Sequence, residues 1–417
     1  MKKTFSFVFA LMLAVLSAGC HYQRLNEGEE IEIQTLTVAD EGYYQRFKDD
    51  KISINVYNWG EYISDGSDGL LDINAEFTEL TGIEVNYSTY ATNEELYAKL
   101  KGGASEYDII IPSDYMISRM IKEEMLLPLN YDNIPNFSNI MDRFRNMSYD
   151  EENLYSVPYT WGTVGIIYDN TALSIPEEEM DWTLLWDEKY KDQILMFDNP
   201  RDAFAIAEVL LGYSMNTENE KELKLAAEKL KEQKNLVQSY VMDEIFDKMG
   251  AGEAVLAPYY AGDALTLMDE YDHLSFVVPK SGTNLFIDAM CIPYCAKQKE
   301  AAEMYINFMC EADCAYATTS YIGYSTPNQA AFDMLDDESK EDKVSYPDSE
   351  YIENSTTVYV NLSDEANRTM QNLWTDMKSS EEAGVNKWLV PLFLILCIMT
   401  SIGILIRRYI RNKKDIF

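Results

Sequence analysis

Histidine is almost absent from this chain of 417 residues, which contains only His21 and His273. With so little imidazole, a zinc site would need four cysteine thiolates. The sequence also lacks a glycine-rich phosphate-binding loop, a Gly-x-Ser-x-Gly nucleophile motif and a histidine pair at metal-ligand spacing. Its carboxylates are numerous, but no pattern singles out a catalytic pair. We therefore expect no enzyme activity, no metal site and no cofactor.

The N-terminal end lacks a hydrophobic run long enough for a comfortable membrane span, although a shorter run is present. Lys2 and Lys3 precede an apolar stretch from Phe5 to Leu16, and small residues then lead to Cys20. This arrangement is typical of a secretory signal. The position of Cys20 after Ala-Gly suggests acylation, as in bacterial lipoproteins, and an uncleaved signal anchor is the alternative.

The C-terminal end does contain a long hydrophobic run. Residues 388–406 are uncharged and apolar over about the length of a transmembrane helix. Five basic residues follow within 407–417, and such clusters stay on the cytoplasmic side of the membrane. Together the two ends predict that the intervening polypeptide, from Cys20 to about Asn386, lies on the extracytoplasmic face of the cytoplasmic membrane, periplasmic or at the cell surface.

Basic residues are scarce in that intervening part. Without the two ends, 26 basic and 70 acidic residues remain, a net charge of −44 compared with −37 for the whole chain. A field of this sign repels nucleic acid and anionic lipid and attracts cations. Much of the charge is expected to form solvated surface, so it permits a cationic ligand without identifying one.

Cysteine is also scarce and gives little guidance. One cysteine lies near each end of the chain, and the other four form two pairs with three residues between the partners: Cys20, Cys397, Cys291 with Cys295, and Cys310 with Cys314. The two pairs fall on a predicted strand end and a predicted helix, where buried free thiols are the favoured interpretation. A disulfide is the alternative, because the domain is predicted to be exported.

Strands and helices alternate from about residue 51 to residue 380, which predicts an α/β architecture with mainly parallel sheets. This length exceeds that of a usual single core, so we expect two lobes. Local signals place some boundaries. A helical pattern stops at Gly82, Asn93 is expected to cap the next helix, and Leu184 to Tyr190 is typical of a helix.

Aromatic residues stand beside acidic or polar ones at or near the ends of five predicted strands. These clusters are Tyr57 to Tyr62, Pro112 to Tyr115, Pro158 to Gly162, Tyr259 to Asp263, and Phe286 to Asp288. In open α/β sheets, ligands bind beyond the carboxyl ends of strands. An organic polycation needs carboxylates at its ammonium groups and aromatic faces along its methylene chain. Ordinary core packing explains any one aromatic residue, but explains five such clusters less well.

At these clusters the sequence resembles the bacterial spermidine/putrescine-binding proteins that serve ABC importers. The resemblance extends from about Ser53 to at least Asp348. Besides Tyr57 to Tyr62 and Tyr107 to Tyr115, it rests on several short stretches: Tyr87 to Tyr90, Asn93 to Leu100, Asn136 to Asn139, Tyr155 to Gly162, Arg201, Gly212 to Ser214, and Gly323 to Asn328.

The resemblance implies a two-lobed periplasmic-binding-protein fold with a hinge and a polyamine held in the cleft between the lobes. The site residues that it implies, or that we add as sources of charge, are Trp59, Glu61, Tyr62, Ser113, Tyr115, Asn199, Asp202, Tyr260, Asp263, Phe286, Asp288 and Tyr324. Closure around the ligand would then be a population shift that a permease can recognise.

This chain departs from the family at two of these positions. Asn199 stands where the best-known spermidine binders have Asp, and Val358 falls roughly where a Gln is expected. Asp263 or Asp198 could supply the missing charge. If neither does, the hypothesis is that the site prefers a diamine to a triamine.

We expect six segments in the chain. They are a signal (1–20), a stalk (21–50), a first lobe (51–159 with 284–326), a second lobe (160–283 with 327–385), a transmembrane helix (388–406) and a basic cytoplasmic tail (407–417). The function expected from the resemblance is polyamine capture for an ABC permease, with membrane attachment through the C-terminal helix and no nucleic-acid partner. A membrane-tethered receptor or sensor for another cationic solute is the alternative.

Overall fold

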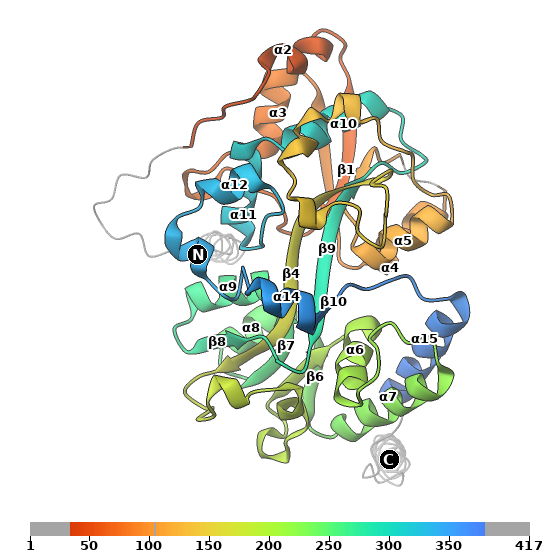
Figure 1. Ribbon diagram of the computed structural model, residues 1–417, viewed down its shortest axis with the longest axis vertical. Helices are drawn as coiled ribbons and strands as arrows, with labels where there is room; N and C mark the ends of the chain where they lie inside the picture. Colours follow the sequence, from red (N-terminus) through yellow and green to blue (C-terminus); the bar gives the residue numbers. More distant parts are fainter. Residues whose placement is uncertain (1–33, 104–105, 380–417) are drawn as a thin grey trace, which may run out of the picture.

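The two longest strands, β4 (Ser156–Asp169) and β9 (Thr283–Cys291), run through the middle of the molecule (Figure 1). They pair antiparallel from Ser156 opposite Cys291 to Thr163 opposite Leu285. Every residue of β9 and all but the last residue of β4 are buried, as expected for strands covered on both faces. This computed structural model describes residues 34–103 and 106–379.

Around one end of this central pair lies the half that we call the first lobe (Figure 1). Its strands follow the order β2-β1-β3-β9, with β1 parallel to β2 and β3, and β3 antiparallel to β9. The bounds are β1 (Ser53–Trp59), β2 (Glu84–Tyr90), β3 (Ile109–Ile110), α2 (Glu41–Tyr44), α3 (Ile73–Thr81), α4 (Asn93–Lys101), α5 (Asp114–Lys122), α10 (Lys299–Met309) and α11 (Ala312–Ile322).

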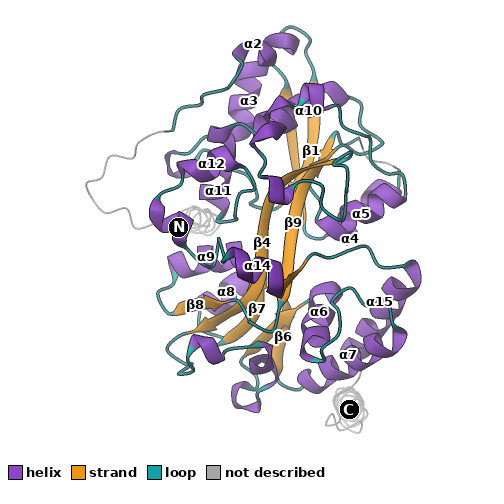
Figure 2. Cartoon of the chain, viewed as in Figure 1, coloured by secondary structure: helices purple, strands orange, loops and turns teal. Residues whose placement is uncertain are grey.

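The half around the other end of the pair is the second lobe (Figure 1). Its strands follow the order β4-β7-β5-β6, β8 also pairs with β4, and β10 pairs with β9. Helices flank the strands in both lobes (Figure 2). The bounds are β5 (Ile194–Phe197), β6 (Val237–Val241), β7 (Leu256–Tyr260), β8 (Leu274–Val277), β10 (Thr356–Thr357), α6 (Pro200–Leu210), α7 (Glu220–Gln233), α8 (Glu244–Gly250), α9 (Ala261–Glu270) and α15 (Asp364–Ser379).

The sheet is mixed, which corrects the expectation of mainly parallel sheets. Within the described residues, β4 is antiparallel to each of its partners β7, β8 and β9. The reason is topological, because the chain passes from the first lobe to the second along β4 and returns along β9. Hydrophobic patterning identifies buried strands but carries no information about their direction.

Capping residues set the ends of the helices, and one of the two predicted caps is corrected by the structure. The α3 helix ends at Gly82, whose φ of +75° suits glycine, as the sequence predicts. At α4 the cap is Thr92, whose hydroxyl accepts a hydrogen bond from the Glu95 N–H, so the prediction for Asn93 was wrong. Asn93 instead accepts a hydrogen bond from the backbone N–H of Ser113 and donates one to its hydroxyl.

Two other expectations change. The stretch Leu184 to Tyr190 forms short 3-10 segments, Trp182–Trp186 and Glu188–Tyr190, instead of one helix. Within the expected stalk, residues 34–50 pack against the first lobe. There Tyr44 is fully buried and donates a hydrogen bond to Glu311, 2.7 Å away. The rest of that stalk, 21–33, lies outside the described residues.

The expected lobe boundaries at 159/160 and 283/284 fall within β4 and β9, and they stay a prediction. The segment after residue 326 begins against the first lobe, since the Asn328 amide donates to the Cys310 carbonyl at the end of α10. The remaining helices of this region are α12 (Gln329–Met334), α13 (Asp337–Glu341) and α14 (Ser349–Ser355).

The expected membrane segments lie outside the part of the chain that the structure describes. These are the signal (1–20) with Cys20, the span (388–406) and the tail (407–417). Within 34–103 and 106–379, no helix combines the length and apolarity needed to cross a bilayer. The four cysteines in these ranges, two in each predicted pair, are free thiols, and all except Cys295 are buried.

Candidate ligand-binding cleft

A cavity of about 420 Å³ opens between the lobes. Small-molecule sites typically measure about 300–1,000 Å³, so this cavity has the volume for an organic ligand. All twelve residues proposed from the sequence line it: Trp59, Glu61, Tyr62, Ser113, Tyr115, Asn199, Asp202, Tyr260, Asp263, Phe286, Asp288 and Tyr324. The strand ends thus bring together side chains that are more than 200 residues apart in the sequence.

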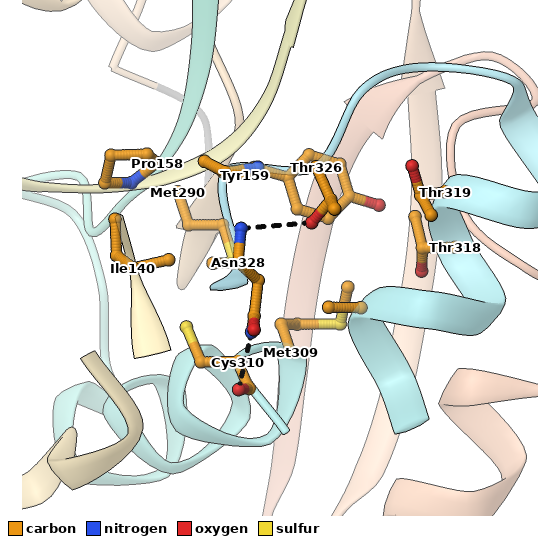
Figure 3. A pocket seen from close by; sticks show the side chains of 12 residues that line it. Ile140, Pro158, Tyr159, Met290, Met309, Cys310, Thr318, Thr319, Thr326 and Asn328 are labelled. Atoms are coloured by element: carbon orange, nitrogen blue, oxygen red, sulfur yellow. Dashed lines mark hydrogen bonds between the residues drawn. The ribbon is translucent and has the colours of Figure 1, made fainter. Parts of the chain in front are cut away.

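A second cavity lies in the first lobe, beside Tyr159 (Figure 3). Its volume is about 10 Å³, which is close to the minimum of about 10–15 Å³ that one water molecule needs. Asn328 there donates hydrogen bonds to Thr326 and Cys310, shown as dashed lines. This cavity is too small for an organic solute.

Asp288 occupies the middle of the cleft on β9. Its Oδ2 accepts a hydrogen bond from the Tyr62 hydroxyl, 2.8 Å away, and that hydroxyl also lies 2.6 Å from Thr160 Oγ1. The other oxygen, Oδ1, is buried without a hydrogen-bond partner in the described residues. Burial raises the pKa of Asp288 to about 6, although the hydroxyls of Ser113 and Tyr62 oppose the rise. A buried carboxylate with a vacant oxygen is costly until a cation pairs with it.

Asp202 lies on the second-lobe side, in the first turn of α6, where the helix dipole favours a negative charge. It accepts hydrogen bonds from Tyr260 (2.7 Å), Tyr359 (3.1 Å) and the side-chain amide of Asn199 (2.8 Å). Asn199 also caps α6 by accepting a hydrogen bond from the Arg201 N–H. Burial raises the pKa of Asp202, and the two tyrosine hydroxyls oppose the rise.

A third acidic group combines Glu61, which follows β1, with Asp243 and Asp263 of the second lobe. Burial raises the pKa of Asp263 to about 7, the Tyr324 hydroxyl opposes the rise, and the charges of Asp243 and Glu61 add to it. Burial also raises the pKa of Asp243, with Glu244 and Glu61 contributing. The Glu61 charge therefore acts on acidic groups of the opposite lobe.

Aromatic rings fill the spaces between these carboxylates. Tyr324 packs edge-to-face on Tyr62 with ring centroids 5.0 Å apart, and on Phe286 at 5.9 Å. Tyr260 packs in the same way on Phe286 at 5.5 Å. Gly262 allows this approach, because a Cβ at that position would lie 2.2 Å from the Tyr324 ring. The walls between the acidic groups thus suit a methylene chain.

Comparison with known proteins identifies the family. The family of bacterial extracellular solute-binding proteins matches residues 105–355. The spermidine/putrescine-binding periplasmic protein of Escherichia coli (strain K12) is 38% identical over 309 residues, which cover 73% of this chain and 86% of that protein. The chain belongs to this family of bacterial solute-binding proteins. Its members are substrate-binding components of transport systems and not enzymes.

Solved structures agree with this assignment of a two-lobed solute-binding protein. A putative spermidine/putrescine ABC transporter protein from Listeria monocytogenes has a TM-score of 0.74 and 35% identity, covering 78% of this chain and 99% of that one. The spermidine/putrescine ABC transporter substrate-binding protein PotD from Streptococcus pneumoniae has a TM-score of 0.69 and 36% identity, covering 79% and 99%.

The cleft of this solute-binding protein also contains residues that the sequence did not identify. The polar ones include Asn93, Glu94, Asp114, Asp243 and Asn284, and the aromatic ones include Tyr90, Phe246, Tyr259, Tyr321 and Tyr359. Most lie outside the five aromatic–acid clusters, and none is among the site positions that the family resemblance supplied. Asp114 and Tyr259 lie inside two clusters and were not selected.

The structure also shows where Asp198 and Val358 lie relative to the cleft. Asp198, considered as a source of missing charge, pairs with Lys378 at 2.5 Å and is not among the residues lining the cleft. Val358 does not line the cleft either, whereas the adjacent Tyr359 does. Of the two residues considered as sources of charge, Asp263 is therefore the one that faces the ligand space.

Proposed function

We propose that this protein captures a polyamine, spermidine or putrescine or both, outside the cytoplasm and delivers it to an ABC importer. The observation that carries the proposal is the charge of the cleft lining. Among the described residues it contains seven acidic side chains and no Lys, Arg or His: Glu61, Glu94, Asp114, Asp202, Asp243, Asp263 and Asp288. A linear polycation matches such a lining, because it places a positive charge at intervals along an apolar chain.

In the proposed complex, one ammonium group pairs with Asp288, where Oδ1 has no partner in the described residues. A second ammonium group lies near Asp202, or near Glu61 at the other side of the cleft. The rings of Trp59, Tyr62, Tyr115, Tyr260, Phe286 and Tyr324 line the methylene path. The ligand would then contact both lobes and favour the closed state, which a permease can distinguish from the open one.

The protein is also proposed to be tethered to the outer face of the cytoplasmic membrane. Residues 388–406 would form the anchor, the tail 407–417 would stay cytoplasmic, and Cys20 is the candidate lipidation site. The length and charge pattern of the sequence support the anchor, and a relative described as a periplasmic protein supports the extracytoplasmic side alone. Keeping a receptor at the membrane would raise its local concentration beside a permease.

Titration calorimetry on the full-length protein in a mild detergent tests the function. Spermidine and putrescine are expected to bind with micromolar or higher affinity, and a butane diol as long as putrescine is expected to give no heat. Binding of the diol would show that charge is not what the cleft recognises. Absence of binding by both polyamines would contradict the proposal and favour a receptor or sensor for another cationic solute.

A further inference from the structure

Glu94 is a carboxylate of the cleft to which no role has been assigned so far. It lies in the first turn of α4, in the first lobe, and its side chain is exposed at the cavity. Its only hydrogen bond among the described residues comes from the Tyr115 hydroxyl, 3.1 Å from Oε1. It takes part in no ion pair within those residues. Most of its acceptor capacity therefore faces the cavity.

Glu94 lies opposite the Asp202 end of the second lobe. Tyr115, which donates to Glu94, packs edge-to-face on Tyr359 at 6.4 Å, and Tyr359 donates a hydrogen bond to Asp202. Burial raises the pKa of Asp202. The Tyr260 and Tyr359 hydroxyls and the Arg201 charge oppose the rise, and the Glu94 charge adds to it. Two carboxylates from opposite lobes thus act on the same end of the cleft.

The same end has lost a formal charge at Asn199, according to the family resemblance. Here the Asn199 amide is directed at Asp202 and not at the cavity. A carboxylate offers about four acceptor sites, and Asp202 already uses three of them for Tyr260, Tyr359 and Asn199. Asp202 therefore has one acceptor site and a single negative charge to offer a cation. Any second negative charge at this end has to come from another residue.

We propose that Glu94 supplies that second charge, so that an ammonium group at this end is held by Glu94 of the first lobe and Asp202 of the second. The proposal rests on the function proposed above. It implies that Glu94 carries a charge for the ligand at an end of the cleft where position 199 has none. An ammonium ion between the two carboxylates would draw the lobes together, whereas without it the two negative charges repel each other.

The test compares Glu94→Gln with Glu79→Gln in the full-length protein. Both variants remove one negative charge from a first-lobe helix, but Glu79 is exposed on α3 and does not line the cleft. Glutamine at position 94 can still accept the Tyr115 hydrogen bond, so the fold is expected to persist. Glu94→Gln should weaken polyamine binding by roughly 10- to 100-fold, the effect of losing a hydrogen bond to a charged group. Glu79→Gln should bind as the wild type does.

A double variant tests whether Glu94 compensates for Asn199. Adding Asn199→Asp to Glu94→Gln returns a carboxylate to the same end of the cleft, and part of the lost affinity should return. Equal affinities for Glu94→Gln and Glu79→Gln would overturn the role of Glu94. A double variant that binds no better than Glu94→Gln would overturn the compensation. If the wild type binds neither spermidine nor putrescine, the proposed function is wrong and this inference is wrong with it.

Discussion

Asp288 and Asp202 are both buried carboxylates of one cleft, but their surroundings differ. Asp288 lies on a central strand, accepts one hydrogen bond from Tyr62 and has one oxygen without a partner in the described residues. Asp202 lies at a helix N-terminus and accepts three hydrogen bonds. The buried, unpartnered oxygen of Asp288 is costly without a cation, whereas the hydrogen bonds of Asp202 also organise the second-lobe wall. We therefore expect Asp288 to serve binding alone and Asp202 to serve both binding and the structure of the site.

The largest expected effect comes from Asp288→Asn. Removing the charge should weaken polyamine binding by roughly 100-fold or more, since the ammonium group would be left buried without its partner. The unfolding temperature of the ligand-free protein should stay the same or rise, because a poorly paired buried charge is removed. Calorimetry and thermal unfolding measure the two quantities, with the exposed Asp337→Asn as control. An unchanged affinity would remove Asp288 from the site.

Asp202→Asn should affect both binding and stability. The amide that replaces one carboxylate oxygen would face a hydroxyl or amide donor, so the free energy of unfolding should fall by about 1–3 kcal/mol. Affinity should fall as well, since one charge partner is lost. Denaturant unfolding and calorimetry report the two changes. If binding weakens with no loss of stability, Asp202 is a ligand contact without a structural role, and the contrast with Asp288 fails.

Asn199→Asp should have a smaller effect that concerns selectivity. The new carboxylate would replace an amide that lies 2.8 Å from Asp202, so it adds charge to this end and removes a hydrogen bond. The ratio of spermidine to putrescine affinity should rise by a few-fold, because a triamine has one more positive charge to pair. An unchanged ratio would contradict the hypothesis that Asn199 shifts the site towards diamines.

The smallest expected effect is the dependence of affinity on pH. The pKa of Asp288 is raised to about 6 and that of Asp263 to about 7, so both lose protons between pH 5 and 8. A bound cation favours the ionised forms, and affinity should therefore rise over this interval. The stability of the ligand-free protein should change in the opposite direction. For groups with a raised folded-state pKa, the stabilising contribution is complete below the unfolded-state pKa, near 4, and is lost as pH rises through 6 to 7.

Titrations at several pH values, with thermal unfolding in parallel, measure both trends. In Asp288→Asn the part of each trend near pH 6 should disappear, whereas the part near pH 7 should persist. Identical profiles for this variant and the wild type would show that Asp288 does not titrate in this range.

The sequence predicted which residues line the cleft better than it predicted the directions of the strands in the sheet. Tyr62 and Asp288 stand in two of the aromatic–acid clusters at strand ends, and the family resemblance selected them from those clusters. Glu94 was missed because, in the first turn of a helix, it looks like any solvated glutamate. Tyr359 was missed because it stands outside the five aromatic–acid clusters and outside the stretches that resemble the family. The antiparallel direction of β4 was also missed, since it depends on how the chain passes between the lobes.

Because β4 and β9 pass through both lobes, they limit how the lobes can move relative to each other. Two continuous, hydrogen-bonded strands cannot swing like a flexible linker, so the lobes can move only by twisting or bending this ribbon. The ladder is interrupted where its register shifts between Pro158 and Thr160, and bulges increase local twist. Deformation should therefore concentrate at Tyr159. If the lobes close on the ligand, part of the binding free energy would be spent on deforming this ribbon. The same amount would be recovered when the ligand leaves. Amide hydrogens along β4 should exchange slowly with solvent, with faster exchange confined to the bulge.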